Sequence, residues 1–260
     1  MIKLSIITIN YNNSNGLSKT IESIISQTFT DFEFIIIDGG STDNSVEIIK
    51  KYSDKINYWV SEKDKGIFNA QNKGIEKASG EYCLFLNSGD YLINKKVLNK
   101  VFSENYPEDI LYGNMKIVWG NRRSTIGKMP ENISHFQMYR DTLWHPVSFI
   151  KRQLFEKYGN YDESYKIVAD YDFFFRTIIK NNVSTRYFST TISVFDCTGI
   201  SSIPKYKLLE NSERERVIKN YLTETEIAEL EEQLKAYMLK KKKIFNRIIN
   251  KLKEKFGWII

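Results

Sequence analysis

The sequence predicts an α/β fold in which a mostly parallel central sheet is covered by helices on both faces. Strand-like and helix-like patterns alternate over the first 90 residues and are joined by short connections. Alternation of this kind implies right-handed crossovers between parallel strands. The chain has 260 residues, of which 42% are hydrophobic, so it can build one large core.

Four strands and three helices are expected in this first part of the chain. The strands are predicted, from their short apolar runs, at residues 3–10, 32–38, 56–60 and 81–86. The helices are predicted between them at residues 15–27, 43–52 and 67–78. In the first of these helices Leu17, Ile21 and Ile24 recur at helical spacing, which places them on one face.

The second part of the chain has a mixed pattern. The expected elements are a helix at 96–102, paired strands at 110–118 and 123–126 with a turn at Gly120-Asn121, a loop as far as His145, and helices around 152–158 and 170–180. A long helix is predicted from residue 223 to about 256. Its start is indicated by Thr223 and Glu226, which have the spacing of a capping box.

Composition excludes several classes of protein. The two cysteines, Cys83 and Cys197, lie far apart, which argues against a zinc site or a disulfide framework. The apolar run at residues 4–9 is followed by asparagines and not by a small-residue cleavage site, so it indicates a strand and not a signal peptide. No stretch approaches the ~20 apolar residues that span a bilayer. A reducing cytoplasm is therefore the expected location.

Charge is concentrated near the end of the chain. The net charge is +6, but residues 235–255 hold nine basic side chains and one acid, Glu254, so the remainder is slightly acidic. Large aliphatic side chains lie among these basic residues, a pattern typical of a helix that docks residues 235–260 on an anionic membrane surface. The alternative is a charged helix whose apolar face packs on the body or on another subunit.

Polar residues follow each of the four predicted strands. They are Thr8, Asn10 and Tyr11 after the first, the segment beginning with Asp38 after the second, Glu62 and Asp64 after the third, and Asn87, Ser88 and Asp90 after the fourth. Ligands bind outside the carboxyl ends of the strands in open α/β sheets. These clusters therefore predict a ligand site on one rim of the sheet.

No glycine-rich phosphate loop accompanies this rim. The first strand is followed by NYNNS and not by GxGxxG, and the P-loop pattern is absent. A pyrophosphate bound here would need another counter-charge, and a divalent metal held by carboxylates is the simplest one. Mg²⁺ or Mn²⁺ prefers oxygen ligands and often binds through one or two carboxylates plus substrate phosphates.

Several of these segments, in this order and at this spacing, resemble family-2 glycosyltransferases with the GT-A fold. The segments are SIITINYN (5–12), DGGSTDNS (38–45), SEKDKGI (61–67), NKG (72–74), LNSGD (86–90), WHP (144–146), FEKYG (155–159) and DYDFF (170–174). The resemblance implies a Rossmann-like catalytic domain at residues 1–220, followed by a basic amphipathic C-terminal helix at 221–260. Within the domain, about 1–95 would bind the nucleotide-sugar and about 96–220 would form the acceptor side.

The resemblance also implies a reaction. A sugar would pass from a nucleotide-sugar, with a UDP-sugar as the expected donor, to a hydroxyl of a glycan or lipid-linked acceptor, with inversion of the anomeric centre. The product would be a surface polysaccharide or lipopolysaccharide, made by a cytoplasmic enzyme that is peripheral on the inner face of the cell membrane.

A second function is open at this point, that of a non-catalytic nucleotide- or nucleic-acid-binding protein with a basic tail. The aliphatic side chains among the basic residues of the tail suit lipid better than a phosphate backbone. No nucleic-acid partner is therefore expected.

The matching positions carry implied roles. The residues expected to bind the nucleotide-sugar are Thr8, Asn10, Tyr11, Asp38, Glu62, Asp64, Asn72, Lys73, Asn87 and Ser88. Asp90 would bind the Mn²⁺ or Mg²⁺ ion. Asn87 stands where the metal motif of this family usually begins with an acid.

Two neighbouring acids compete for the role of general base. A sugar hydroxyl is a poor nucleophile, so a positioned carboxylate should take its proton, and the resemblance assigns this role to Asp170. Asp172 is the rival, although it would also favour the positive N-terminal dipole of its helix. His145 is expected beside the acceptor site, where it is either catalytic or structural.

Overall fold

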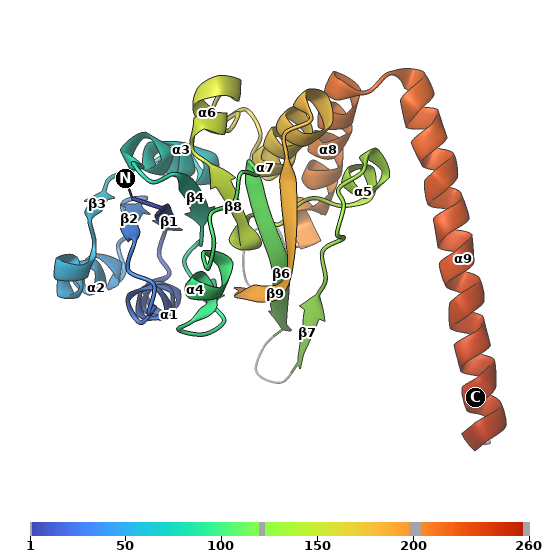
Figure 1. Cartoon of the computed structure of the whole chain (residues 1–260), viewed down its shortest axis with the longest axis horizontal. Coiled ribbons are helices and arrows are strands. Elements are labelled where there is room, and N and C mark those ends of the chain that lie inside the picture. The colour runs from blue at the N-terminus through green and yellow to red at the C-terminus, as the bar shows by residue number, and fades with distance from the viewer. Residues whose placement is uncertain (1, 120–122, 198–203, 257–260) are drawn as a thin grey trace.

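The computed structural model describes residues 2–119, 123–197 and 204–256, and it confirms the α/β fold class (Figure 1). The strands are β1 Leu4–Asn10, β2 Phe32–Asp38, β3 Tyr58–Ser61, β4 Tyr82–Phe85, β5 Tyr91–Leu92, β6 Ile110–Trp119, β7 Arg123–Gly127, β8 Ser148–Lys151 and β9 Thr185–Asp196. They form one nine-stranded sheet in the order β3-β2-β1-β4-β8-β6-β9-β5, with β7 paired to β6.

Helices flank this sheet on both faces. The α-helices are α1 Ser14–Ile25, α2 Ser45–Lys51, α3 Ile67–Lys77, α4 Val97–Val101, α5 His135–Arg140, α6 Gln153–Tyr158, α7 Ala169–Phe174, α8 Lys207–Tyr221 and α9 Glu224–Phe256. A π-helix at Phe175–Lys180 continues α7, and short 3₁₀ turns occur at Ser53–Lys55, His145–Val147 and Pro204–Tyr206.

The first four strands are parallel, as predicted, and their register builds the rim. Asn10 at the end of β1 lies beside Asp38 at the end of β2, and Asp38 lies beside Ser61 at the end of β3. Alternate residues point to opposite faces, so that Ile7 packs with α3 and Ile6 packs with α1. Both faces are thus buried, and polar side chains are left to the carboxyl ends.

The second half of the sheet is mixed, as the mixed sequence pattern of that part of the chain indicates, and β6 and β9 are its parallel pair. The four-residue strand β8 is antiparallel to both β4 and β6, and the two-residue strand β5 is antiparallel to β9. Strands this short carry too few side chains to show a period of two. β6 and β7 pair as expected, whereas the predicted turn at Gly120-Asn121 lies outside the described residues.

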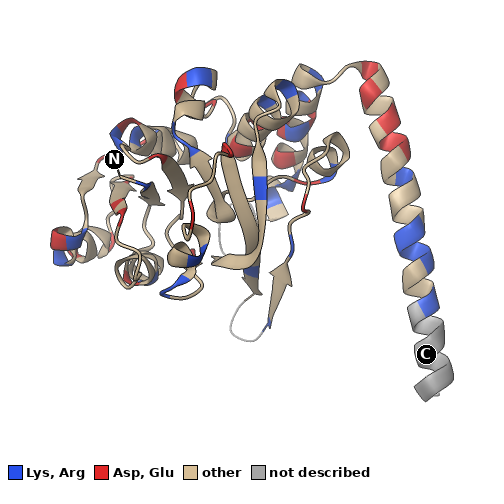
Figure 2. Ribbon diagram, in the orientation of Figure 1, with Lys and Arg blue, Asp and Glu red and all other residues tan. Residues whose placement is uncertain are grey.

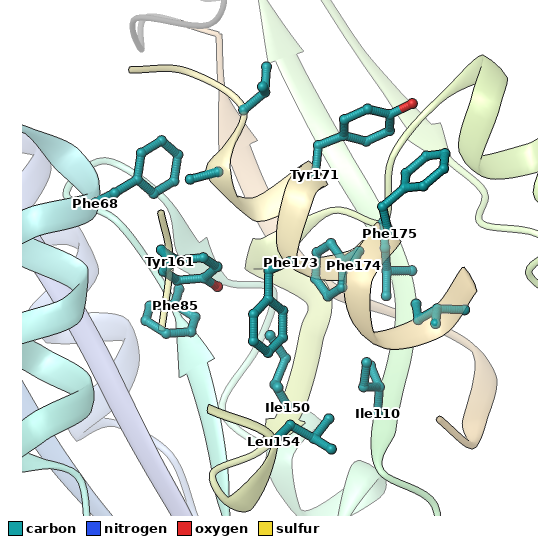
Figure 3. Close-up of a cluster of buried hydrophobic side chains, with 14 of the residues drawn as sticks. Phe68, Phe85, Ile110, Ile150, Leu154, Tyr161, Tyr171, Phe173, Phe174 and Phe175 are labelled. Atoms are coloured by element: carbon teal, nitrogen blue, oxygen red, sulfur yellow. The ribbon is translucent and has the colours of Figure 1, made fainter. Parts of the chain in front are cut away.

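Aromatic side chains form the core beneath α7 (Figure 3). The Phe173 ring stacks on Phe155 at a centroid distance of 4.5 Å, and Tyr161 packs edge-on against both. Phe85 of β4 joins the same group. This packing fixes the helix that carries Asp170 against the parallel half of the sheet.

The final helix, α9, begins with the predicted capping box and then leaves the body (Figure 1). Glu226 accepts from the Thr223 backbone N–H at 2.7 Å, and the Glu226 N–H donates to the Thr223 hydroxyl at 3.3 Å. Leu230 is buried, and the Tyr237 ring lies against Phe136 of α5. No helix of the described ranges is long and apolar enough to span a bilayer.

Candidate active site

Asp38 is the junction of the three parallel strand ends. Its buried carboxylate accepts four hydrogen bonds, from Asn10 Nδ2 at 2.7 Å, Ser61 Oγ at 2.6 Å, Ser41 Oγ at 2.6 Å and the Ser41 backbone N–H at 2.9 Å. Burial acts to raise the pKa of Asp38, but the bonds from Ser41, Ser61 and Asn10 outweigh it and lower the pKa below its usual range. Asp38 is therefore a charged anchor that organises the rim from beneath.

Tyr11, Gly39 and Asp64 form the outer surface of this corner. The Tyr11 side chain is 66% exposed. A Cβ atom on Gly39 would lie 2.4 Å from Asp64 Oδ2 and 3.3 Å from Tyr11 Cδ2, so the glycine lets both side chains approach the backbone closely. Glu62, which follows β3, pairs with Lys73 of α3 at 2.6 Å. The structure thus brings Tyr11 and Asp64 together at Gly39 and joins Glu62 to Lys73.

Two of the predicted nucleotide-binding side chains, those of Thr8 and Asn72, form hydrogen bonds within the protein interior. Thr8 is fully buried, and its hydroxyl donates to the Leu86 carbonyl at 2.8 Å. Asn72 donates to the Tyr161 carbonyl and to Glu163, and accepts from the Tyr161 N–H. Both side chains brace the rim without facing solvent, a distinction that depends on tertiary contacts and has no sequence signal.

The loop after β4 is tied to the loop after β1. The Ser88 N–H donates to the Ile9 carbonyl at 3.0 Å, and its hydroxyl donates to the Asn13 carbonyl at 3.1 Å. Asn13 Nδ2 returns a bond to the Ser88 carbonyl at 3.0 Å. The segment that carries Asn87, Ser88 and Asp90 therefore continues the rim begun at β1.

Asp90 is buried at this rim with a second acid beside it. Within the described residues its Oδ1 accepts a single long bond, 3.4 Å, from the backbone N–H of Asp196, the last residue of β9. Burial raises the pKa of Asp90 to about 7, while His145 lowers it and the Asp196 carboxylate raises it further. The sequence did not point to Asp196, because β9 was not predicted.

The donor set at Asp90 suits a divalent ion that is completed by a ligand. Among the described residues no group of three or more His, Cys, Asp and Glu side chains could hold a metal on its own. One carboxylate with free lone pairs, at a rim where phosphates would bind, is the arrangement that Mg²⁺ accepts. The residues present therefore fit an ion shared between Asp90 and a diphosphate.

Asn87, His145 and Asp170 form a row that crosses from β4 to α7. Asn87 Nδ2 lies 3.2 Å from His145 Nε2, and His145 Nδ1 lies 3.3 Å from Asp170 Oδ2. On the other side of Asn87, its Oδ1 accepts from Gln71 Nε2 at 3.2 Å. The side chains of His145 and Asp170 are 21% and 16% exposed, so both reach the solvent at the rim.

Asp172 points away from this row. It is buried, its Oδ1 accepts from the Tyr221 hydroxyl at 3.0 Å, and its Oδ2 lies 3.5 Å from Arg176 Nη2. Burial raises the pKa of Asp172 despite the nearby Arg176. Its partners belong to α8 and to the π-helix, so its role is to hold these elements together.

The fold and the site together are those of an α/β protein with polar and acidic side chains at the carboxyl ends of parallel strands and a partly exposed carboxylate, Asp170, across the rim. The profile of "Glycosyl transferase family 2" matches residues 5–169. The chain belongs to this family, and it is a glycosyltransferase. This finding decides between the enzyme and the non-catalytic binding protein in favour of the enzyme.

Relatives of known sequence support the same assignment. An uncharacterized glycosyltransferase of Mycobacterium tuberculosis is 33% identical over 205 residues, which cover 76% of this chain and 77% of that protein. A PGL/p-HBAD biosynthesis glycosyltransferase of Mycobacterium bovis is 28% identical over 201 residues, covering 75% and 77% of the two chains.

Solved structures share the fold. The S. aureus TarS fragment 1–349 in complex with UDP has a TM-score of 0.60 at 22% identity, over 75% of this chain and 60% of that one. The mannosyltransferase PcManGT from Pyrobaculum calidifontis, in complex with GDP-Man and Mn²⁺, has a TM-score of 0.57 at 14% identity, over 82% and 60%. The present chain thus spans less than two thirds of these structures.

Proposed function

We propose that this glycosyltransferase transfers a sugar from a UDP-sugar to a hydroxyl of a glycan or lipid-linked acceptor, with inversion, in the synthesis of a surface polysaccharide or lipopolysaccharide. The observation that carries the proposal is Asp170, a partly exposed carboxylate joined through His145 to the loop of Asp90. The UDP complex of TarS, with its similar fold, supports the choice of nucleotide. The name of the M. bovis relative supports a glycolipid product.

Asp170 is the base in this proposal. The acceptor oxygen attacks the anomeric carbon as its proton passes to Asp170, and the bond from that carbon to the diphosphate breaks, so that the nucleoside diphosphate leaves with the electron pair. Attack and departure on opposite faces of the sugar give inversion in one displacement. Asp170 can perform this task because its Oδ1 accepts from the Tyr171 N–H at 2.9 Å and keeps a second lone pair for the acceptor proton.

Asp90 would hold the Mn²⁺ or Mg²⁺ ion, and the bound ion would neutralise the charge that develops on the departing diphosphate. The Mn²⁺ complex of PcManGT, whose fold is similar, supports this choice. Asn87 is engaged by Gln71 and His145 and is not counted among the metal ligands.

A donor screen tests the proposed function. The assay measures the release of UDP, GDP and dTDP from nucleotide-sugars that carry glucose, galactose, N-acetylglucosamine or mannose. Each donor is tested with Mn²⁺, with Mg²⁺ and with EDTA. Metal-dependent release from a UDP-sugar is the expected result. Release of GDP or dTDP alone would overturn the donor class while leaving the family assignment intact.

Substitution of Asp38 should lower stability, whereas substitution of Tyr11 should weaken donor binding. Asp38→Asn replaces an oxygen that accepts buried bonds with an amide, so we expect the free energy of unfolding to fall by about 1–3 kcal/mol. Tyr11→Ala removes an exposed ring and should cost roughly 1–3 kcal/mol of UDP binding, the typical value of a base–aromatic contact, with no change in stability. Calorimetry with UDP and thermal unfolding measure both. Equal stability loss in both variants would contradict this division.

We also propose that α9 docks on an anionic membrane at the inner face of the cell membrane. In Figure 2 the first turns of α9 carry acidic residues, coloured red, and the turns further along carry basic residues, coloured blue. Beyond Tyr237 the helix leaves its contacts, and Met238, Leu239, Ile244 and Phe245 are exposed. They lie next to Lys240–243 and Arg247, so apolar side chains and positive charges are available on the same exposed turns.

Vesicle binding tests the membrane proposal. The double variant Ile244→Glu/Phe245→Glu should bind phosphatidylglycerol vesicles at least about tenfold more weakly than the unaltered protein, because it loses two apolar insertions. The control Leu208→Glu replaces an apolar side chain on α8 that is more exposed than Ile244 or Phe245, and it should bind normally. Unaltered binding by the double variant, or no preference over phosphatidylcholine, would refute membrane docking.

A further inference from the structure

The hydrogen bonds that join Gln71 of α3 to Asp170 of α7, through Asn87 and His145, all have the same donor-to-acceptor direction. Gln71 Nε2 donates to Asn87 Oδ1, so the Asn87 amide turns its Nδ2 donor toward His145. A donor facing Nε2 requires that this ring nitrogen accept. The proton of the neutral imidazole is then on Nδ1, and Nδ1 faces Asp170 Oδ2 at 3.3 Å.

Asp170 is consequently held at both of its oxygens. Oδ1 accepts from the Tyr171 N–H at 2.9 Å, and Oδ2 accepts from His145 Nδ1. Each oxygen keeps a second lone pair for a substrate. A carboxylate bonded in this way is fixed in rotation about its side chain, which is what a base needs if it is to meet one hydroxyl at one angle.

We propose that Asn87 and His145 are positioning residues for the base. The Asn87 amide selects the Nδ1–H tautomer of His145, and that tautomer holds the Asp170 carboxylate in the orientation in which it accepts the acceptor proton. The inference rests on the proposed role of Asp170. It also gives a reason for asparagine at a position where the family usually has an acid.

An acid at position 87 would act in the opposite sense. A carboxylate there accepts a hydrogen bond and therefore demands a proton on His145 Nε2. The ring then either gives up its Nδ1 proton, and Asp170 loses a donor, or it becomes a charged imidazolium, and Asp170 becomes a weaker base. Asn87→Asp should for this reason slow transfer, whereas a weakened metal ligand would be improved by the same change.

The tautomer is measured directly in the free protein. The chain has two histidines, so long-range ¹⁵N–¹H spectra of the imidazole rings contain two sets of signals, and His145→Asn identifies those of His145. At pH 8 we expect His145 to be protonated at Nδ1 and Asn87→Asp to add a proton at Nε2. His135 is exposed and serves as the internal reference. An Nε2–H tautomer in the unaltered protein would overturn the proposal.

Conservative substitutions provide the kinetic test. The asparagine amide nitrogen takes the place of His Nδ1, and the glutamine amide nitrogen takes the place of Nε2. His145→Asn should therefore keep a kcat at least about tenfold above that of His145→Gln, which should fall by about 10²-fold through misplacement of the base. The donor KM should stay unchanged in both. The assay is UDP release from whichever of UDP-glucose, UDP-galactose and UDP-N-acetylglucosamine the unaltered enzyme turns over fastest.

The failures of the two proposals are distinguishable. Equal losses in His145→Asn and His145→Gln, or losses of kcat that follow losses of thermal stability, would show a structural histidine and refute the positioning role. Full activity of Asp170→Asn would instead refute Asp170 as the base. The tautomer spectrum does not depend on turnover and tests the hydrogen-bond row in either case.

Discussion

Asp170→Asn is expected to lower kcat for sugar transfer by about 10²–10⁴-fold, the usual contribution of a positioned general base. The asparagine keeps the shape of the side chain, and its one amide oxygen can keep the bond from the Tyr171 N–H, while its amide nitrogen takes the place of the oxygen that faces His145. It has no basic oxygen that can take the acceptor proton. Donor affinity should stay within about threefold, since binding precedes proton transfer. Stopped-time transfer assays and calorimetry with UDP separate the two effects.

The matched control is Asp172→Asn, two residues along the same helix. Asp172 is buried and contacts Tyr221 and Arg176, so its loss should lower the free energy of unfolding by about 1–3 kcal/mol with little change in kcat at a temperature where the variant is folded. The reverse result, a stable but inactive Asp172→Asn and an active Asp170→Asn, would exchange the two roles.

These two acids show where sequence reasoning reaches its limit. Both lie in one motif and carry the same charge, and a helix start was correctly expected there. Which of them faces the rim depends on the turn of α7 and on the partners that α8 supplies, and α8 was not predicted. Its polar and apolar residues follow no amphipathic stripe, because it packs through the buried Val217 and Glu213 and not through one apolar face.

The parallel half of the fold can be predicted from the sequence because its local patterns are strong. Its strands β1 and β2 have seven residues and are mostly apolar, and all four strands end in a polar cluster, so local pattern and tertiary position agree. The strand β2 was predicted with the bounds that the structure has, Phe32–Asp38. The helix α5 was missed because it has only six residues, His135–Arg140, and one buried side chain, Met138. Short elements of this kind are fixed by what packs on them.

The candidate site divides in the same way. Residue types and their order along the chain predict polar side chains at the strand ends, and the structure places Tyr11 and Asp64 together at Gly39 while it buries Asp90. The sequence does not show that the side chains of Thr8 and Asn72 donate hydrogen bonds to backbone carbonyls of other segments. Nor could it show Gln71, whose contact with Asn87 gives the hydrogen-bond row its direction.

Asp90→Asn is expected to stabilise the free protein at pH 8 while it abolishes the effect of Mn²⁺ on UDP binding. Burial raises the pKa of Asp90 to about 7, against an ordinary value of 3.8. The folded protein therefore takes up a proton below pH 7 that the unfolded chain takes up only near pH 4. The stability that this proton confers is complete below about pH 4 and is lost as the pH rises through about 7, at about 1.4 kcal/mol per pH unit between them.

The difference in unfolding free energy between the two proteins isolates this group. Urea titrations at pH 5, 6, 7 and 8 should show Asp90→Asn gaining on the unaltered protein up to about pH 7 and then keeping a constant lead. Titrating groups that do not interact with Asp90, including the buried Asp172, cancel in the difference. Parallel curves over this range would mean that Asp90 is ionised throughout.

Addition of Mn²⁺ and UDP should make the unaltered protein more stable than Asp90→Asn. Under the proposal, Mn²⁺ with UDP would bind the ionised Asp90 of the folded protein and would stabilise the unaltered chain by mass action, whereas Asp90→Asn would lack this ligand. The control Asp64→Asn removes an acid on the nucleotide side of the rim and should weaken UDP binding equally with and without Mn²⁺. Buried acids without a firm partner cost stability, so a site that keeps one at pH 8 has a use for its charge. Retention of Mn²⁺-enhanced UDP binding by Asp90→Asn would assign that use to another residue, with Asp196 as the neighbour to test next.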